Sequence, residues 1–355
     1  MANELGRRRA SRVYCATVRR GFTAERGGAP AALGIDGSGR KPMLHGMIDA
    51  VFAGHHDHSA MLREGPPSAS VHWALRSIDP GGRILSVEPL DGGISHANHA
   101  IRIEIGGAIH EVVLRRWVRD CPQEDDTGFS AAQEAATYGL LAAGAVPALR
   151  LLAADLDARE CDVPALLLTR APGTAPTAPY DMAGFLGQLA AVLPAIHAVD
   201  PERAARTVPP YRPYYTADSL RVPAWTRAPS AWERAIDLSA GPRPTGPAAF
   251  IHRDYHPGNT LWVAGRLTAI VDWTSASWGP PAVDVAHMRA NLAMSFGVGA
   301  ADEFLENFRA VAGSYTHDPY WDLRVAVDFL PELTPETRPE FDRLDDFVIR
   351  AAAAL

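Results

Sequence analysis

A short polar segment in the C-terminal half of the chain carries the residues with the clearest capacity for chemistry. It reads His252-Arg253-Asp254-Tyr255-His256-Pro257-Gly258-Asn259, and Ile270-Val271-Asp272-Trp273 follows it. Magnesium prefers hard oxygen ligands, a few from the protein and the rest from water and phosphate. Asn259 and Asp272 can supply the protein share, while Asp254 stays able to accept a proton from an attacking hydroxyl. The spacing therefore predicts phosphoryl transfer from a nucleotide to an alcohol.

The residues between Asn259 and Asp272 indicate how the two side chains come together. Two short apolar runs, 260–263 and 267–271, surround Ala264-Gly265-Arg266. That pattern is typical of a β-hairpin. A hairpin centred between Gly265 and Arg266 places Asn259 and Asp272 opposite each other at the base of the two strands.

These two segments resemble the catalytic motif of the aminoglycoside phosphotransferase family, which shares the protein-kinase-like fold with choline kinases and homoserine kinases. The resemblance extends from about Ser70 to Leu292. It implies an α+β, bilobal fold with a small antiparallel-sheet N-lobe that carries one helix, and a larger, mainly helical C-lobe. It also implies Mg²⁺ as cofactor and ATP or GTP as co-substrate.

The chain divides into three segments by composition and by this resemblance. Up to Lys41 it holds nine basic and three acidic residues with little periodic apolar pattern. We expect residues 1–69 to be a disordered extension or the product of a start codon assigned too early, because no apolar core of a secretory signal follows the arginines. Residues 70–170 are expected to form the nucleotide-binding N-lobe, and 171–355 the catalytic and substrate-binding C-lobe.

A glycine turn between two predicted strands, 83–90 and 98–105, offers a contact for phosphate. Adjacent glycines let backbone N–H groups approach phosphate oxygens and tolerate positive φ. The turn resembles the GGxS turn of the family. The resemblance implies nucleotide contacts at Gly92, Gly93 and Ser95.

The next strand, 111–117, has to provide the cation that holds the nucleotide phosphates. The only lysine of the chain is Lys41, so this cation is an arginine unless Lys41 is recruited from far upstream. The planar guanidinium fork meets phosphate oxygens bidentately. Strand alternation places Arg115 and Arg116 on opposite faces, and the pattern alone does not choose between them. The family alignment favours Arg115 and leaves Arg116 for solvent.

A helix with recognisable ends follows this strand. Ser130 and Gln133 form a capping box, small and apolar residues continue to Ala143, and Gly144 ends the helix. The resemblance implies that Glu134, in the first turns, pairs with the strand arginine. A glutamate near a helix N-terminus is also favourable to the helix dipole alone.

Residues 163–169 are predicted to form a short apolar strand, which Arg170-Ala171-Pro172-Gly173 breaks. The resemblance places the hinge between the lobes here, with backbone groups from Leu168 to Arg170 meeting the adenine. From Asp181 onward, apolar residues at helical spacing predict a helix that ends at His197. We expect His197 to be a packing or capping residue.

The resemblance also assigns supporting roles around the catalytic loop. It implies that His252 and His256 buttress the loop and that Asp284 braces it. Arg253 replaces the usual glycine and gives the His-Arg-Asp of protein kinases. The segment between Asp272 and Asp284 is too short for an activation loop, so a protein kinase is disfavoured.

Bulk composition narrows the class of protein. The chain has 34 basic and 41 acidic residues, 47% hydrophobic residues and three cysteines. The balance argues against a nucleic-acid binder, and the cysteines are too few and scattered for a disulfide framework or a zinc site. No apolar stretch is long enough for a transmembrane helix. We expect a globular, cytoplasmic protein with no membrane partner.

Two regions leave the acceptor open. Residues 200–248 are rich in proline and aromatic residues and are expected to be irregular, as a substrate-facing insertion or a plain connection. Residues 291–355 are acidic and are expected to form helices with acidic faces. Such faces are explained by solvation, and they would also attract a cationic acceptor. Aminoglycosides, macrolides, amino alcohols and sugar-like compounds all remain open.

Two other functions compete with the kinase hypothesis. A catalytically silent pseudokinase would bind a nucleotide without transferring phosphate. A metal-dependent hydrolase would use His252, Asp254 and His256, which alternate and would share one face of a strand. Pro257 and Gly258 interrupt such a strand directly after them. The sequence leaves both the oligomeric state and the choice between ATP and GTP open.

Overall fold

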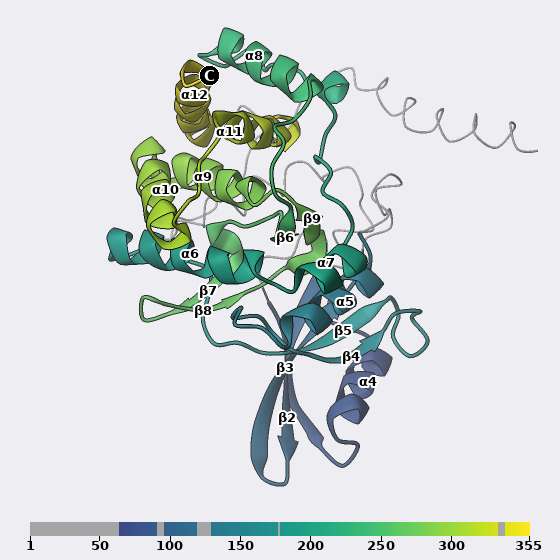
Figure 1. The fold of residues 1–355 in the computed structure, drawn as a ribbon. Helices are drawn as coiled ribbons and strands as arrows, with labels where there is room; N and C mark the ends of the chain where they lie inside the picture. The colour runs from purple at the N-terminus through teal and green to yellow at the C-terminus, as the bar shows by residue number, and fades with distance from the viewer. Residues whose placement is uncertain (1–63, 91–95, 119–128, 177, 333–337) are drawn as a thin grey trace, which may run out of the picture. The chain divides into compact units, whose positions relative to one another are not determined.

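The N-terminal sheet consists of five antiparallel strands in the order β1-β2-β3-β5-β4 (Figure 1). The computed structural model describes residues 64–90, 96–118, 129–176, 178–332 and 338–355. The strands are β1 (Arg83–Pro89), β2 (Ala97–Ile105), β3 (Ala108–Arg116), β4 (Leu151–Asp155) and β5 (Ala165–Thr169). Strand β3 lies between β2 and β5 and is hydrogen-bonded to both. The two neighbours fix its backbone, and the backbone sets the directions of its side chains.

The tight β2–β3 turn sets the register that places the strand arginine. Gly106 and Gly107 have φ values of 57° and 85°, which glycine adopts without the steric cost of a side chain. The resulting register puts Asn98 opposite Arg115. Positions 98 and 115 therefore face the same side of the sheet, where the functional site lies.

Two described helices accompany the sheet, one more than expected. Helix α4 (Ser68–Ile78) was not predicted from the sequence; it buries Trp73 and Ala74 in a cluster with strand residues that include Ile101 and Leu114. Its apolar face is narrow, and Pro67 at its start offers no side-chain cap. Tertiary packing against the sheet is therefore what stabilises it.

Helix α5 (Ala131–Leu141) begins where the sequence predicts. The Ser130 hydroxyl accepts a hydrogen bond from the Gln133 backbone N–H at 3.1 Å. The reciprocal half of the capping box is not made, because the Gln133 side chain donates to the Thr207 carbonyl at 2.9 Å. This contact ties α5 to α7 (Pro201–Thr207).

The C-terminal part is mainly helical. Its longer helices are α6 (Met182–His197), α8 (Pro229–Ala240), α9 (Ala282–Phe296), α10 (Val298–Ala312), α11 (Pro319–Ala326) and α12 (Arg338–Ala353). Two short strand pairs accompany them, β6 (Ala249–Ile251) with β9 (Ser277–Gly279), and β7 (Thr260–Val263) with β8 (Arg266–Ile270). Every residue from Val283 to Met294 is buried, so α9 is the central helix of this part.

Residues 200–248 are more regular than expected. Helices α7 and α8 both begin with a proline in the first turn, where its missing N–H costs nothing. Trp232 of α8 stacks on Phe341 of α12 with ring centroids 5.6 Å apart. The proline content suggested irregular structure, but two of these prolines start helices, and α8 buries the aromatic side chain of Trp232.

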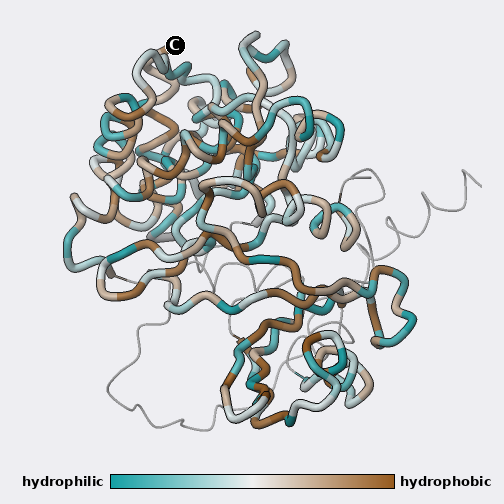
Figure 2. Tube along the Cα trace, turned by 60° about the horizontal axis from the view of Figure 1, so that its bottom comes forward, coloured by the Kyte–Doolittle hydropathy of each residue, from teal (hydrophilic) through white to brown (hydrophobic). Residues whose placement is uncertain are grey.

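Hydrophobic (brown) and hydrophilic (teal) residues are interspersed along the trace (Figure 2), and β5 carries an uninterrupted hydrophobic run. This matches the burial of the sheet, in which Leu166, Leu167 and Leu168 of β5 are almost completely inaccessible. A strand buried on both faces needs no polar alternation. Among the described residues no single helix is long and apolar enough to cross a membrane; α6 and α7 pass that test only as a pair, bent by 84°.

The β7–β8 hairpin is present, with a register that differs from the prediction. Ala264 and Gly265, with φ of 47° and 76°, form the turn, and a bulge lies between Leu261 and Trp262. Thr260 consequently pairs with Ile270, and the Asn259 carbonyl accepts from the Val271 N–H at 2.9 Å. Asn259 therefore lies opposite Val271, and Asp272 follows one residue later.

A close backbone approach joins the chain after β5 to this hairpin. Thr174 and Trp262 exchange backbone hydrogen bonds of 3.2 and 2.9 Å. Gly173, with φ of 112°, lies so close that a Cβ atom would be 2.6 Å from the Trp262 carbonyl oxygen. The glycine at the predicted hinge is thus required by packing against β7.

We expect Asp322 to be a strong determinant of stability in the helical part. Its carboxylate is buried, accepts a hydrogen bond from Arg289 Nε at 3.1 Å, and lies 2.9 Å from His317 Nε2. Removing one partner from a buried ion pair costs about 3–5 kcal/mol. Asp322→Asn should lower the free energy of unfolding at pH 7 by an amount of this order, measured by denaturant titration.

The pH dependence has a defined sign. Burial acts to raise the pKa of Asp322, but His317 and Arg289 outweigh it and hold the pKa below the ordinary 3.8. Its stabilising contribution is therefore present above that value and is lost as the pH falls through the folded-state pKa. The difference between wild type and Asp322→Asn should shrink at low pH; an equal difference at pH 7 and pH 3 would contradict this.

Candidate active site

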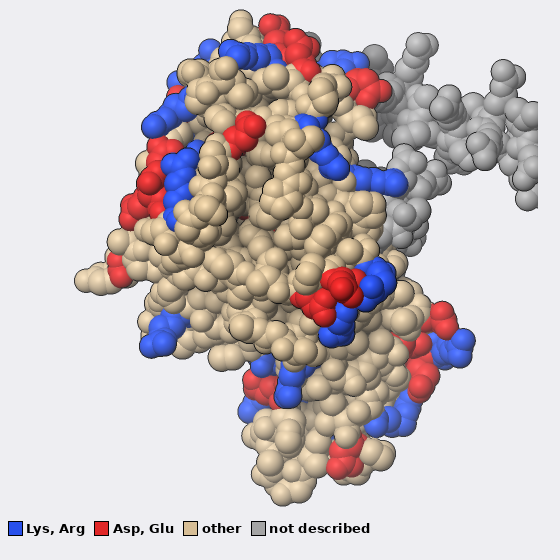
Figure 3. Space-filling model, in the orientation of Figure 1, with Lys and Arg blue, Asp and Glu red and all other residues tan. Residues whose placement is uncertain are grey.

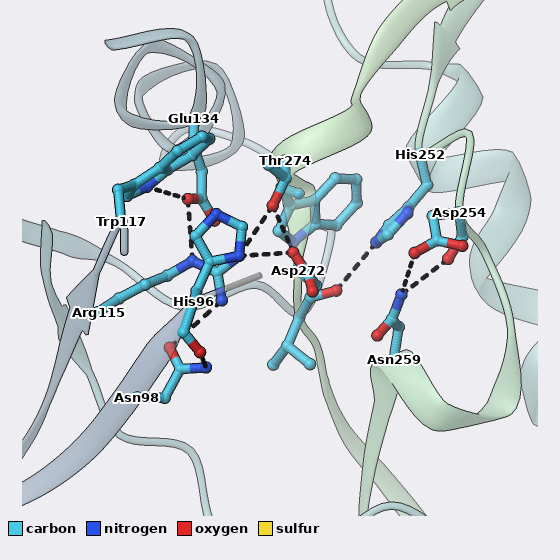
Figure 4. Close-up of polar contacts among 12 residues, drawn as sticks. His96, Asn98, Arg115, Trp117, Glu134, His252, Asp254, Asn259, Asp272 and Thr274 are labelled. Carbon is cyan, nitrogen blue, oxygen red and sulfur yellow. Dashed lines mark hydrogen bonds and ion pairs between the residues drawn. The ribbon is translucent and has the colours of Figure 1, made fainter. Parts of the chain in front are cut away.

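Arg115 of β3 is the centre of a buried polar network (Figure 4). Its Nε donates to Glu134 of α5 at 2.9 Å, and its Nη2 donates to Asp272 Oδ1 at 2.6 Å. The same Nη2 donates to the Thr274 hydroxyl at 2.8 Å. Burial disfavours the charged form, but Asp272 and Glu134 outweigh it and hold the pKa of the guanidinium above its usual value. Arg115 thus remains a cation and joins the sheet to the segment after β8.

Arg116 occupies the opposite face of β3, as alternation requires. It is only 3% exposed, and its Nε donates to Asp162 Oδ1 at 3.0 Å. Ser70 of α4 donates to the same oxygen at 2.9 Å. The prediction that Arg116 faces solvent is therefore wrong: helix α4, which the sequence did not predict, covers that face and provides the environment for an internal ion pair.

Three residues that sequence reasoning did not assign complete the environment of Arg115. His96 Nδ1 lies 3.0 Å from Arg115 Nη2, and because a guanidinium can only donate, this nitrogen is the acceptor. Trp117 Nε1 donates to Glu134 Oε2 at 3.1 Å and packs edge-on against His96. Thr274 donates to Asp272 Oδ1. The strand alternation from Arg115 to Trp117 could have indicated Trp117, whereas nothing local indicated His96 or Thr274.

Asp272 lies in a strained backbone conformation. It is in the left-handed region with φ of 63°, which is costly for a residue with a Cβ atom. Burial acts to raise the pKa of its carboxyl, but Arg115 outweighs it and holds the pKa below the usual value. The contacts with Arg115 and Thr274 both use Oδ1. The other oxygen, Oδ2, is the one available to face a divalent cation.

Asp254 and Asn259 are held together within the loop of residues 252–259. The Asn259 Nδ2 donates to the Asp254 backbone carbonyl at 2.9 Å and to Asp254 Oδ2 at 3.0 Å. Figure 4 shows the amide nitrogen turned toward Asp254 and the amide oxygen turned away from it. Because the Asn259 amide nitrogen donates to Asp254, the amide oxygen is the atom that remains to bind a hard cation. The oxygens of Asn259 and Asp272 fit the preference of magnesium.

The Asp254 carboxylate is both ordered and accessible. Its side chain is 34% exposed, so a small molecule in solution can reach it. Burial acts to raise its pKa, but His256 and the hydrogen bond with His287 outweigh it and hold the pKa well below the ordinary value. Asp254 is therefore ionised at neutral pH. Burial lowers the pKa of His256 to about 4, and its Nδ1 accepts from the Gly258 N–H at 3.1 Å.

Asp284 at the start of α9 holds the backbone of this loop. It is completely buried, and it accepts from the backbone N–H groups of His252 at 3.0 Å and Arg253 at 2.7 Å. His197 Nε2 lies 3.1 Å from the same carboxylate. His197, which the sequence predicted to be a packing or capping residue at the end of α6, therefore contacts Asp284.

His252 and Arg253 face away from Asp254. His252 Nε2 donates to the Val271 carbonyl at 3.0 Å, and its ring packs on Trp273. Arg253 has a φ of 69°, which favours glycine and explains why a glycine is common in the resembling motif. Its guanidinium lies over the Tyr214 ring, 4.2 Å from the centroid. Both residues buttress the loop.

The predicted nucleotide contacts are placed in part. Gly92, Gly93 and Ser95 lie outside the described residues. Leu168 lies inside the sheet, paired with Val113 on one side and Leu151 on the other. Arg170 follows the end of β5, and its Nη1 lies 3.3 Å from Glu111. Arg170 therefore lies outside the strand pairing of the sheet, whereas Leu168 is paired on both sides.

Asp284→Asn is expected to lower both stability and turnover. An asparagine has one acceptor oxygen, so its amide nitrogen would face at least one of the donors that now share the carboxylate. Each buried donor left without an acceptor costs about 1–3 kcal/mol. Thermal denaturation should show a lower Tm and steady-state kinetics a lower kcat. A variant with wild-type Tm and kcat would show that Asp284 does not hold the loop.

The antiparallel sheet with its Arg115–Glu134 pair and the helical part with the Asp254 loop define a bilobal, protein-kinase-like fold. The chain belongs to the phosphotransferase enzyme family, whose model matches residues 86–323. No curated protein matches the chain.

Solved structures share this fold at low sequence identity. An aminoglycoside phosphotransferase mutant, in a ternary complex with AMP-PNP and hygromycin B, has a TM-score of 0.58 and 17% identity, covering 80% of this chain and 98% of that chain. A putative aminoglycoside phosphotransferase from Ralstonia eutropha has a TM-score of 0.55 and 14% identity over 81% and 99%. A macrolide 2'-phosphotransferase from Brachybacterium faecium has a TM-score of 0.50 and 20% identity, covering 72% of this chain and 87% of that chain.

Proposed function

We propose that the protein transfers the γ-phosphoryl group of ATP or GTP to a hydroxyl of a small molecule. Residues 70–170 would bind the nucleotide, and 171–355 would carry the catalytic loop and the acceptor. The observation that carries this proposal is the 2.6 Å ion pair between Arg115 and Asp272. It brings the strand cation to the carboxylate beside the Asp254–Asn259 loop, so that phosphate, metal and base would meet in one place.

Asn259 and Asp272 would hold Mg²⁺. When bound, the ion would neutralise charge on the phosphate oxygens and bridge them to the protein. The chain contributes the orientation: Asn259 is fixed through its nitrogen by Asp254, and Asp272 is fixed through Oδ1 by Arg115. Both residues keep an oxygen for the ion without moving.

Arg115 would contact the nucleotide phosphates, with Glu134 setting its direction. Its Nε donates to Glu134 and its Nη2 donates to Asp272. These two carboxylates therefore fix the orientation of the guanidinium. Backbone groups of Gly92, Gly93 and Ser95 would contact phosphate. We place the adenine at the backbone from Leu168 to Arg170, with Arg170 the better candidate because Leu168 is paired inside the sheet.

Asp254 would orient the acceptor hydroxyl and take its proton. Its lowered pKa makes it a weak base. Phosphoryl transfer passes through a loose transition state in which the attacking oxygen has gained little bonding, so position matters more than base strength. The order imposed by Asn259 supports this role.

Ion pairs formed by acidic residues of the C-terminal helices bear on whether the acceptor is a cation. Described acids of the C-terminal helices pair with arginines, as in Arg289–Asp322, Arg324–Asp328, Arg227–Asp346 and Arg350–Asp302. Figure 3 shows acidic and basic side chains side by side on the visible face. Acidic composition alone therefore does not support a cationic acceptor, and we propose a hydroxylated small molecule.

The hydrolase alternative gains no support from the described residues. Among them no group of three or more His, Cys, Asp and Glu side chains is arranged to hold a metal ion. The Nε2 of His252 carries a proton, because its partner, the Val271 carbonyl, can only accept. His252 is thus directed away from Asp254 and His256.

The experiment is a screen of hydroxylated compounds for nucleotide consumption with Mg²⁺, using ATP and GTP in parallel. The panel should include aminoglycosides, macrolides, amino alcohols and sugars. We expect one class to stimulate consumption and to yield a phosphorylated product by mass spectrometry. Nucleotide binding with no product from any class would favour the pseudokinase, and stoichiometric zinc in the purified protein would favour the hydrolase.

A further inference from the structure

We propose that His287 is a positioning residue for Asp254, holding the carboxylate in the rotamer that meets the acceptor hydroxyl. This inference rests on the proposed function, in which Asp254 is the base. His287 lies on α9, far along the chain from the catalytic motif, and sequence reasoning did not single it out.

The two carboxylate oxygens of Asp254 have separate partners. His287 Nε2 lies 3.1 Å from Oδ1, and Asn259 Nδ2 lies 3.0 Å from Oδ2. An ionised carboxylate can only accept hydrogen bonds, so His287 Nε2 carries a proton and donates it. One donor on each oxygen fixes both the χ1 and χ2 rotation of Asp254. Removing either donor would leave the carboxylate free to rotate about the other.

Helix α9 contacts the loop twice from one face. Asp284 accepts from the loop backbone at His252 and Arg253, and His287 contacts the side chain of the next residue, Asp254. Residues three apart on a helix lie on the same face. The helix that fixes the loop backbone therefore also fixes the carboxylate, and both contacts share one rigid support in the buried centre of the C-lobe.

The surroundings of His287 keep its ring in place. It is 7% exposed, and its ring lies against Phe329 and His256, with centroids 5.5 and 5.9 Å away. His256 itself is 3.8 Å from Asp254 Oδ1, beyond hydrogen-bond distance. His287 is thus the closer imidazole. An imidazole N–H donates without the permanent charge that an arginine or lysine would place beside the base.

The test compares His287→Phe with His287→Gln. Phenylalanine keeps the ring volume and removes the donor, whereas the glutamine amide nitrogen can reach about the position of Nε2. A matched control is His317→Phe, which removes the imidazole of another buried His–Asp pair, 2.9 Å from Asp322. The readout that needs no known acceptor is Mg-ATP hydrolysis, with water as acceptor, together with the Kd for the nucleotide and circular dichroism.

We expect His287→Phe to lower kcat about 10- to 100-fold, the size of effect that misplacement of a reacting group by about 1 Å produces. The KM for ATP and its Kd should stay within about twofold, because His287 does not contact the nucleotide site. His287→Gln should recover most of kcat. His317→Phe should lower Tm while the folded protein keeps its kcat. Wild-type kcat in His287→Phe, or equal losses in the Phe and Gln variants, would overturn the inference.

A crystal structure of His287→Phe provides a measurement that does not depend on turnover. We expect the Asp254 carboxylate to leave its wild-type rotamer, because only the contact with Asn259 would remain to hold it. An unchanged Asp254 rotamer would overturn the inference even if the protein is a kinase. If the wild-type protein consumes no nucleotide with any acceptor, the proposed function fails, and the rotamer still decides whether His287 positions Asp254.

Discussion

Asp254→Asn is expected to lower kcat about 10²- to 10⁴-fold, the range that a general base contributes, with nucleotide affinity little changed. Asparagine has nearly the shape of aspartate but cannot accept the proton of the acceptor. It also places an amide nitrogen opposite one of two donors, Asn259 Nδ2 or His287 Nε2. The measurement is steady-state kinetics with the acceptor found by the screen, and calorimetric titration with nucleotide.

The matched control for this change is Asp346→Asn on α12. Asp346 pairs with Arg227 and its side chain is 54% exposed. An exposed ion pair contributes little to stability, about 0–1 kcal/mol, so this variant should keep wild-type kcat and Tm. Activity retained at half of wild type or more in Asp254→Asn would mean that another group accepts the proton.

Arg115→Met should strongly lower nucleotide-dependent activity and destabilise the fold. Without the cation, Glu134 is left buried with no ionic partner, and loss of one partner of a buried pair costs about 3–5 kcal/mol. Loss of a charge-stabilising donor lowers kcat by about 10²- to 10³-fold. Denaturant titration and the kcat/KM for ATP measure the two effects.

Arg116→Met, one residue later on the same strand, separates these effects. Arg116 pairs with Asp162 on the face covered by α4, away from Asp272. The variant should lose about 1–3 kcal/mol, because it leaves a partly buried carboxylate unpaired, and the folded fraction should keep its kcat/KM. If Arg116→Met lost activity as much as Arg115→Met, or Arg115→Met lost stability alone, the assignment of the phosphate cation would be wrong.

The fold class was predictable from the sequence because its strongest local signals coincide with its elements. Ser130 caps α5, Asp181 caps α6, and Gly265 lies in the turn of the β7–β8 hairpin. These are short-range features, written in consecutive residues. Helix α4 was not predicted because its stability comes from the burial of Trp73 against the sheet. That contact is long-range, and the neighbouring sequence gives no local signal for it.

The site was predictable where the residues form a continuous motif, and not where α9 or the residue before β2 supplies a side chain. Asp254 and Asn259 lie within one loop, and Asp272 follows at the end of the hairpin. His287 and His96 reach the same site from elements whose local pattern reads as ordinary core. The hairpin register differs from the prediction by one residue because the turn is centred between Ala264 and Gly265 and a bulge follows near Leu261, and apolar spacing shows neither feature.

The central claim is that Asn259 and Asp272 bind one divalent ion beside Asp254. The most direct measurement is a crystal structure with Mg²⁺ and a non-hydrolysable ATP analogue. We expect Mg²⁺ at about 2.0–2.1 Å from one oxygen of each residue, with Asp272 still joined to Arg115 through its other oxygen. An ion bound elsewhere, or a bound ion that has no oxygen of Asp272 or of Asn259 among its ligands, would contradict the account.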